Sequence, residues 1–326
     1  MRKLCTVLAL VMLLTCISMT GCAPQPNPAP DFEYEVNEAG DAIYLQKYIG
    51  TSEDVVIPAE IDGLPVRFLK GISEDRGDYM STVGGVFEGS SIKSVVIPDS
   101  VTSIGQYAFR SCENLKKVTV GSSLKVIAFS AFQFCTSLEK IDLSKTELQI
   151  IGTLAFKGCT ALSEIQFSDC LTTIEDAAFY DCTALTALDF PESLTTIGQE
   201  AFLNCTSLKE IIVPTKLSLM SLDRIRFYNL PALERIVFTP GRTEITGYAF
   251  FDTTTNVEIV IPAGVEKFSP LPFFVHGPAK FIFLGDCPTT IADEEFYGEP
   301  TIYYDPDTDG WDTCVWREKY PLAESK

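Results

Sequence analysis

The feature that most constrains the fold is a five-residue pattern, Ala-Phe-x-x-Cys, that recurs through the middle of the chain. It reads AFRSC at 108–112, AFQFC at 131–135, AFKGC at 155–159, AFYDC at 178–182 and AFLNC at 201–205, always 23 or 24 residues apart. Self-similarity at a fixed period of about 20 to 50 residues is typical of solenoids and other repeat architectures. The chain is therefore expected to be an array of stacked units.

Apolar residues at matching positions extend this register along most of the chain. A residue of the type Ile, Leu or Phe lies five positions before the Phe, as Ile104 does before Phe109, and a run of the form L-x-x-I-x-V follows, as in LKKVTV at 115–120. The alternation at the end of that run predicts a half-buried strand. The ten Phe that mark the units are Phe87, Phe109, Phe132, Phe156, Phe179, Phe202, Phe227, Phe250, Phe273 and Phe296.

Energetics explain why these columns must stack. One unit offers a handful of apolar side chains at roughly 1.5 to 3 kcal/mol each, against about 1 to 2 kcal/mol of backbone entropy for every residue that becomes ordered. A lone unit cannot fold, whereas stacked units bury each other's faces. The sequence predicts a repeat solenoid of the leucine-rich-repeat type, with about ten units of 23 residues built mostly from short β-strands with helical or 3-10 turns, over residues 81–298.

The amino terminus has the composition of an export signal. Arg2 and Lys3 precede an apolar run, and residues 19–22, Met-Thr-Gly-Cys, resemble the bacterial lipobox, which implies removal of residues 1–21 and lipidation of Cys22. An ordinary secretory signal that is cleaved elsewhere is the alternative. Residues 22–30 then form a Pro-rich tether. This predicts an extracytoplasmic, membrane-anchored lipoprotein on the bacterial cell surface. The mature charge, 23 basic against 44 acidic residues or −21, excludes nucleic acid as the expected partner.

The repeat unit itself resembles a known family. IPDSVTSIGQYAFRSCENLKKVTV at 97–120 is similar to the BspA-like leucine-rich repeat of bacterial surface proteins, and the similarity spans about residues 31–320. By the same resemblance, 31–80 is an amino-terminal unit with an inserted loop, and 299–326 is a carboxy-terminal closing unit. The resemblance implies a non-catalytic macromolecule-binding or adhesion module whose ligand is a protein or glycan on a host or neighbouring cell. A glycan-binding or substrate-capture lipoprotein is the alternative, with Tyr180, Tyr228 and Tyr248 as exposed aromatic candidates.

Cysteine and histidine give little support to metal or catalytic chemistry. Apart from Cys5, Cys16 and Cys22, eight of the 11 Cys remain, and five of them share one column that Leu230 also occupies. Small buried side chains explain this column better than disulfides do. There is no C-x-x-C pair, and the single His276 lies in the same column. We expect no catalytic residue, no metal site and no cofactor.

Two regions are candidates for partner binding. Between Leu69 and Phe87 the chain carries about 13 more residues than a regular unit, and this insertion includes Arg76, Gly77 and Asp78, the tripeptide that integrins read. The second candidate is the outward face of the L-x-x-I-x-V strands, which becomes apolar towards the carboxy terminus. Exposed β-branched residues are ordinary in strands, which is the alternative explanation. The predicted patch comprises Ile212, Val237 and Val260, with Glu210, Arg235 and Glu258 at its rim.

Overall fold

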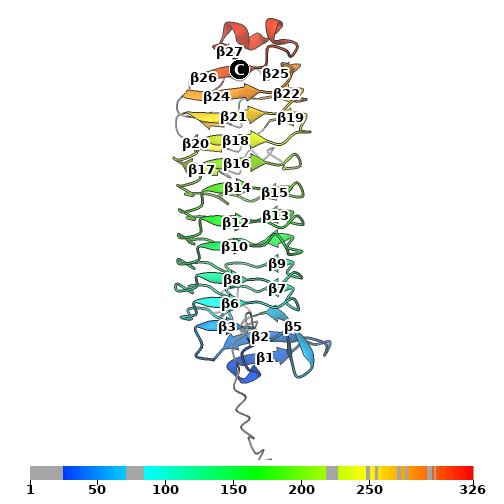
Figure 1. The fold of residues 1–326 in the computed structure, drawn as a ribbon, viewed down its shortest axis with the longest axis vertical. Helices are drawn as coiled ribbons and strands as arrows, with labels where there is room; N and C mark the ends of the chain where they lie inside the picture. Colours follow the sequence, from blue (N-terminus) through cyan, green and yellow to red (C-terminus); the bar gives the residue numbers. More distant parts are fainter. Residues whose placement is uncertain are drawn as a thin grey trace, which may run out of the picture.

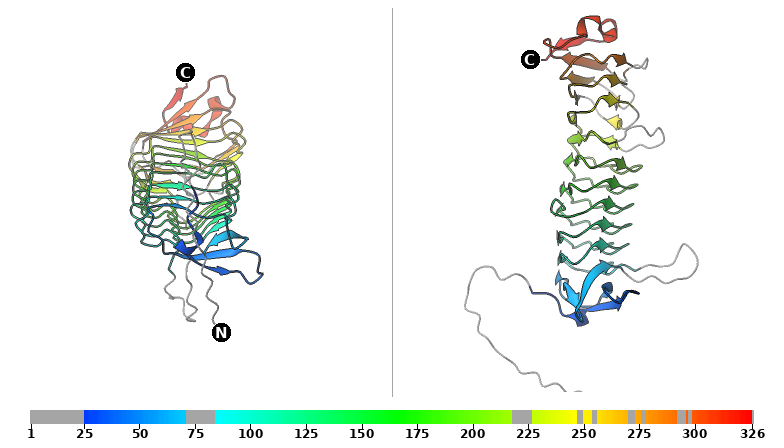
Figure 2. Two further views of the ribbon diagram at one scale, coloured as in Figure 1. Left: turned by 60° about the horizontal axis from the view of Figure 1, so that its bottom comes forward. Right: turned by 90° about the vertical axis from the view of Figure 1, so that its right-hand side faces the viewer.

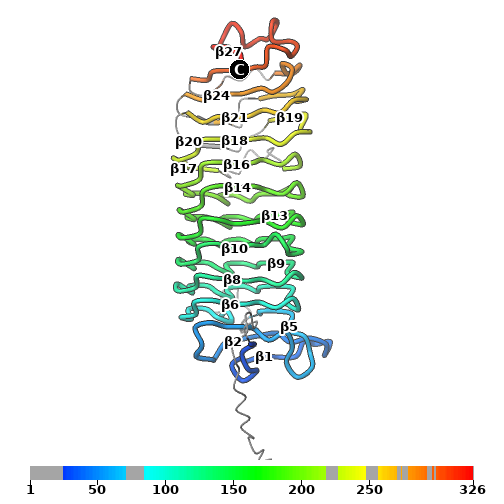
Figure 3. The backbone as a smooth tube through the Cα atoms, viewed as in Figure 1, coloured from blue at the N-terminus to red at the C-terminus, as the bar shows by residue number. Residues whose placement is uncertain are grey.

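The protein is an elongated stack of parallel turns, one above the next, with the amino-terminal strands at one end and the carboxy-terminal strand at the other (Figures 1 and 2). The structure is a computed structural model. It describes residues 25–70, 84–217, 227–246, 250–253, 256–269, 273–275, 278–291, 296 and 299–325. The predicted solenoid of the leucine-rich-repeat type is confirmed, since successive coils of the backbone repeat the same path (Figure 3).

One side of the stack carries the Ile column. Leu69 pairs with Ile104, and Ile104 pairs with Ile127, so the proposed equivalence of Leu69 with the column Ile is correct. All pairs are parallel except β1 with β2 and β4 with β5. The strands in sheet order are β1 (Phe32–Val36), β2 (Ile43–Tyr48), β5 (Leu64–Leu69), β7 (Ser103–Ile104), β9 (Val126–Ile127), β11 (Ile150–Ile151), β13 (Thr173–Ile174) and β15 (Thr196–Ile197), with β4 (Glu60–Ile61) on β5.

The L-x-x-I-x-V runs form a second, continuous face. Five strands pair in parallel in the amino-terminal half: β3 (Asp54–Val56), β6 (Ser94–Val96), β8 (Lys117–Thr119), β10 (Lys140–Asp142) and β12 (Glu164–Gln166). Seven follow in the carboxy-terminal half: β14 (Ala187–Asp189), β16 (Glu210–Val213), β18 (Arg235–Phe238), β21 (Val257–Ile261), β24 (Pro278–Phe283), β26 (Glu299–Tyr304) and β27 (Leu322–Glu324). We call this surface the strand face.

Two short sheets and three 3-10 helices complete the described elements. One sheet contains β17 (Phe227–Leu230), β20 (Phe250–Thr253) and β23 (Phe273–Val275), and the other contains β19 (Glu244–Ile245), β22 (Lys267–Phe268) and β25 (Thr290–Ile291). The 3-10 helices are η1 (Ala29–Asp31), η2 (Trp311–Thr313) and η3 (Val315–Glu318). Among the described residues helices are thus nearly absent, and short turns link the strands of the regular units.

The Phe of the Ala-Phe-x-x-Cys pattern forms a stacked column in the core. Phe109 and Phe132 are fully buried, with ring centroids 4.9 Å apart and planes 4° from parallel. The same arrangement continues from Phe87 to Phe227, with centroid distances between 4.9 and 5.4 Å. Each rung is also fixed to the next by backbone hydrogen bonds, as from Phe109 N to the Ala131 carbonyl at 2.7 Å. The pattern therefore specifies both the packing and the register of the units.

The two variable positions of the pattern form the tip of the turn. The second of them has a positive φ in each regular unit, for example 57° at Ser111, 61° at Phe134 and 60° at Asp181. Gly158, at 73°, occupies the same position, where a residue without a Cβ adopts this left-handed conformation at no steric cost. The flanking Phe and Cys are buried in the core, whereas these two positions form the turn.

The column cysteines are buried free thiols, as the sequence predicts. Each thiol donates a hydrogen bond to the carbonyl of the Phe one unit earlier, from Cys112 to Phe87 at 2.9 Å and from Cys205 to Phe179 at 3.3 Å. Burial raises the pKa of Cys112 to about 11 and that of Cys159 to about 12, so both stay protonated at neutral pH. These cysteines are structural.

Candidate functional site

The strand face is the broad surface that the stack presents to solvent along its whole length. In β8, β10, β12 and β14 the central apolar residue is buried, and the two residues that flank it are exposed. Successive side chains of a strand point to opposite sides of the sheet, so the flanking residues of neighbouring strands line up in two columns. In these four strands both columns are predominantly polar. They contain Lys117, Lys140, Glu164 and Ala187 in one, and Thr119, Asp142, Gln166 and Asp189 in the other.

Beyond β14 the second column becomes apolar. The register pairs Asp189 with Ile212, Ile212 with Val237 and Val237 with Val260, so the structure brings the three predicted aliphatic residues together. Ile212 and Val237 are half-buried. The rim residues Glu210, Arg235 and Glu258 form the first column beside them.

The prediction that Val260 is exposed is wrong, because only 7% of its surface is accessible. Val260 lies between Val237 on one neighbouring strand and Ile282 on the other. Strands in a sheet are only about 4.8 Å apart, so branched side chains in adjacent rungs cover one another. Val260 therefore belongs to the packing of the strand face, and its neighbours on either side carry the accessible surface.

Sequence reasoning missed that the apolar column continues to the carboxy-terminal end. Ile282 pairs with Tyr303, and Tyr303 pairs with Ala323. Both Ile282 and Tyr303 are half-buried. The run PAKFIF at 278–283 has the same spacing as the preceding units and would have identified Ile282. We define the apolar column as Ile212, Val237, Val260, Ile282 and Tyr303.

Opposite charges alternate along the column next to it. The guanidinium of Arg235 lies 3.3 Å from the Glu210 carboxylate, and the ammonium of Lys280 lies 3.0 Å from that of Glu258. The hydrogen bond that Lys280 donates to Glu258 raises the pKa of Lys280. Exposed pairs of this kind contribute little to stability, about 0 to 1 kcal/mol each. Their effect is to border the apolar column with a regular pattern of charge.

A groove in the amino-terminal half of the strand face gathers lysines, which sequence reasoning did not single out. It has a volume of about 570 Å³ and crosses β8, β10 and β12. Lys117 and Lys140 are direct neighbours on adjacent strands, an arrangement of like charges that destabilises a sheet. Within the described part of the chain, none of the four lysines that line the groove forms an ion pair. These lysines are Lys116, Lys117, Lys140 and Lys145.

Acidic side chains share this groove with the lysines. Glu139, Asp142 and Glu164 lie along it. Hydrogen bonds from the hydroxyl and the backbone N–H of Ser144, at 2.7 and 2.9 Å, lower the pKa of Asp142. The groove therefore offers separate positive and negative contacts for a polar ligand.

Several residues that the sequence analysis considered lie outside the described residues. They are Cys22, Arg76, Gly77, Asp78, Tyr248 and His276. Among the residues that the structure does describe, no cluster of three or more His, Cys, Asp or Glu side chains could hold a metal ion. In the same part of the chain, none of the helices has the length and apolar character needed to cross a bilayer.

The stacked parallel units and the open strand face define a solenoid of the leucine-rich-repeat class. The family model described as "BspA type Leucine rich repeat region" matches the chain with six copies, over residues 84–186, 130–256 and 172–302. These matches together span more than half of the chain. The protein belongs to the BspA-type leucine-rich-repeat family, as its repeat unit implied.

Solved structures include several similar leucine-rich-repeat proteins. A leucine-rich-repeat protein from T. pallidum is 25% identical over 71% of this chain and 86% of its own, with a TM-score of 0.47. A leucine-rich cell surface protein from Faecalibacterium prausnitzii is 19% identical over 93% and 96%, with a TM-score of 0.41. The pneumococcal vaccine antigen PcpA is 17% identical over 91% and 97%, with a TM-score of 0.46. No curated protein matches the chain.

Proposed function

We propose that this protein is a lipid-anchored binding module displayed on the bacterial cell surface, without catalytic activity. The single observation that carries the proposal is the strand face, which runs the length of a rigid stack and is open to solvent. A stack in which every rung is fixed to its neighbours by backbone hydrogen bonds presents side chains in ordered columns, which suits recognition of a large partner. Membership of the BspA-type family supports the same reading.

The anchor is proposed to be a lipid on Cys22, with residues 22–30 as the spacer that holds the solenoid away from the membrane. Metabolic labelling with a fatty-acid analogue should mark the wild-type protein, and Cys22→Ser should abolish that label. Cys170→Ser, which changes an exposed cysteine of the solenoid, is the matched control and should be labelled like the wild type. Equal labelling of all three proteins would exclude a lipid on Cys22.

The docking site for a protein partner is proposed to be the apolar column with its charged rim. Ile212, Val237 and Ile282 offer partly accessible aliphatic surface in register. The alternating charges of Glu210, Arg235, Glu258 and Lys280 border it on one side. An apolar centre with a polar rim is the general anatomy of protein interfaces. The favoured partner is therefore a folded protein on a host or neighbouring cell.

A paired set of variants tests this site. Ile212→Arg with Ile282→Arg places bulky charge on the apolar column without entering the core, and should weaken binding to a captured matrix or cell-surface protein by at least about tenfold. Thr119→Arg with Gln166→Arg makes the same change in the same column at the polar end, where both residues are exposed, and should leave binding unchanged. Candidate partners come from an array of purified matrix proteins. Equal affinities of the two variants for the partner would show that the apolar column is not the docking site.

The second candidate is binding of an acidic glycan in the lysine groove. It is favoured by four lysines without ion-pair partners in the described part of the chain, two of which are unfavourable direct neighbours. Sulfate or carboxylate groups of a glycan would relieve that repulsion. On a glycan array, Lys117→Glu with Lys140→Glu should abolish binding of acidic glycans, whereas the Ile212 and Ile282 variant should retain it. The insertion with Arg76, Gly77 and Asp78 remains a further candidate contact.

A further inference from the structure

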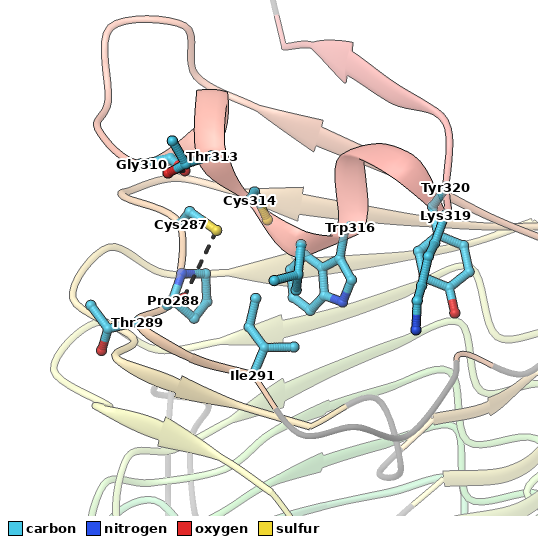
Figure 4. Close-up of a pocket in the computed structure, with 11 residues that line it drawn as sticks. Cys287, Pro288, Thr289, Ile291, Gly310, Thr313, Cys314, Trp316, Lys319 and Tyr320 are labelled. Atoms are coloured by element: carbon cyan, nitrogen blue, oxygen red, sulfur yellow. Dashed lines mark hydrogen bonds between the residues drawn. The ribbon is translucent and has the colours of Figure 1, made fainter.

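The carboxy-terminal cap brings two cysteines together from segments that are far apart in sequence. Cys287 follows β24 in the last regular turn, and Cys314 lies between η2 and η3 in the closing segment. Both line a pocket of about 450 Å³ together with Trp316 and Tyr320 (Figure 4). Cys314 is buried and Cys287 is half-buried.

Backbone and side-chain hydrogen bonds hold the two segments in register. The Trp311 indole N–H donates to the Gly285 carbonyl at 3.1 Å, and the Asp309 N–H donates to the Asp286 carboxylate at 2.9 Å. The Cys287 N–H donates to the Asp309 carbonyl at 2.9 Å. Gly285, Asp286 and Cys287, three successive residues after β24, are thus fixed to the closing segment next to Cys314.

The two cysteines lie close together in this pocket (Figure 4). The interaction between their thiol groups raises the pKa of Cys287 and lowers that of Cys314. The Cys287 sulfur also lies 3.9 Å from the Pro288 carbonyl (Figure 4). The two cysteines are thus neighbours in one pocket, and the hydrogen bonds of their own segments hold them there, so the two thiols are placed where a bond between them can form.

The column cysteines are held differently. Each lies in the core and donates its hydrogen to the carbonyl of the Phe one unit earlier, as Cys182 does to Phe156 at 3.2 Å. Burial raises the pKa of Cys135 and Cys182 well above the ordinary value, so the reactive thiolate is suppressed. Among the described cysteines, those of the core column are therefore inert, whereas Cys287 and Cys314 lie together in the cap.

We propose that Cys287 and Cys314 are joined by a disulfide bond in the exported protein, which fastens the closing segment to the last regular turn. Two S–H bonds break and one S–S bond forms. The two electrons and two protons pass to the disulfide of an extracytoplasmic thiol-disulfide oxidoreductase, which leaves as a dithiol. The inference rests on the proposed surface location, because disulfides persist in oxidising compartments.

The bond would secure the end of the stack. It closes a loop that contains β25, β26 and η2, and a cross-link over a loop of this length restricts the unfolded segment strongly. The cap also covers the terminal core with aromatic contacts, such as Phe283 to Trp311 at 5.2 Å and Phe296 to Trp316 at 5.4 Å. A terminal repeat has a neighbour on one side only, so it frays first unless it is held.

Thiol labelling of the full-length protein from the cell envelope tests the proposal. Iodoacetamide is added before reduction, a second label after it, and the digested peptides are identified by mass spectrometry. We expect Cys287 and Cys314 to carry only the second label in the reduced sample, and to appear in one linked peptide in a parallel digest made without reduction. The column cysteines should carry the first label once the protein is denatured. First label on both Cys287 and Cys314 would overturn the proposal.

A variant series and a control oxidation separate this inference from the proposed location. Cys287→Ser should expose Cys314 to the first label and make the cap at least about tenfold more sensitive to limited proteolysis, whereas Cys170→Ser should change neither. If the protein is absent from the envelope fraction, the location fails and the purified protein is incubated with oxidised glutathione. A linked peptide then supports the pairing of the two cysteines, and its absence refutes it.

Discussion

Replacing Phe179 by alanine should create one of the most costly single cavities in the stack. The side chain is fully buried, with ring centroids 5.1 Å from Phe156 and 5.2 Å from Phe202 and planes within 4° of both. The ring of Phe167 lies nearly perpendicular to that of Phe179, with ring centroids 6.2 Å apart. Loss of a buried Phe costs about 3 to 5 kcal/mol.

The upper part of that range is expected, because the rungs cannot collapse onto the gap. Backbone hydrogen bonds fix the spacing on both sides, from Phe156 N to the Ala178 carbonyl at 2.7 Å and from Phe179 N to the Ala201 carbonyl at 2.8 Å. The substitution also removes two stacked aromatic contacts, each worth about 0.5 to 1.5 kcal/mol beyond the buried area. We therefore expect a loss of about 4 to 5 kcal/mol.

The neighbouring residue provides the control. Tyr180 lies on the turn, partly exposed, and its ring contacts the Lys157 ammonium at 4.5 Å. Tyr180→Ala should cost about 0.5 to 1 kcal/mol. Urea unfolding followed by circular dichroism measures the free energy of unfolding of both variants. Hydrogen exchange locates the units that open, since repeats can unfold locally. Similar losses for the two variants would refute the column register.

Two further predictions concern the column cysteines and a glycine. Because burial raises the pKa of Cys112 to about 11 and that of Cys159 to about 12, from an ordinary value of 9.0, the unfolded chain ionises first as pH rises and stability should fall above that pH. The urea midpoint should therefore decrease from about pH 9 to about pH 11, and should decrease less in Cys112→Val with Cys159→Val. Gly198→Ala should lower the free energy of unfolding by about 1 to 3 kcal/mol in the same assay, because the new Cβ would lie 2.4 Å from the Asp176 backbone nitrogen. The control is Gly84→Ala, whose Cβ would meet nothing within 4 Å and which should be neutral. Equal effects of the two substitutions would contradict this reasoning.

The columns of the core could be predicted from sequence because each unit must bury the same set of apolar side chains. Ile127 and Phe132 belong to columns in which successive units carry the same kind of residue. Parallel stacking places the members of one column in the same buried environment. The same logic identified Leu69 across an insertion, since its partner in the register is Ile104. Because the units repeat, the core residues can be predicted without knowledge of contacts between residues that are far apart in sequence.

The surface could be predicted only in part, because exposure depends on neighbouring rungs as well as on the alternation within a strand. Val260 points outward yet is shielded by Val237 and Ile282. The lysine groove depends on which side chains find ion-pair partners, and spacing does not reveal that. Cys287 and Cys314 come together where the last regular turn meets the closing segment, and there the regular spacing ends, so the sequence pattern does not reveal that they are neighbours.

The carboxy-terminal half of the strand face differs from the rest in strand length as well as in composition. Strands grow from three residues in β14 to four in β16 and β18, five in β21 and six in β24 and β26. The apolar column begins at Ile212, in the first of the longer strands, and reaches Tyr303 in β26. Longer strands are fixed by more inter-strand hydrogen bonds, so they hold a flat apolar surface more rigidly than the short strands can. Because β26 lies within the loop that the Cys287–Cys314 bond would close, that bond would also secure the end of the proposed docking site.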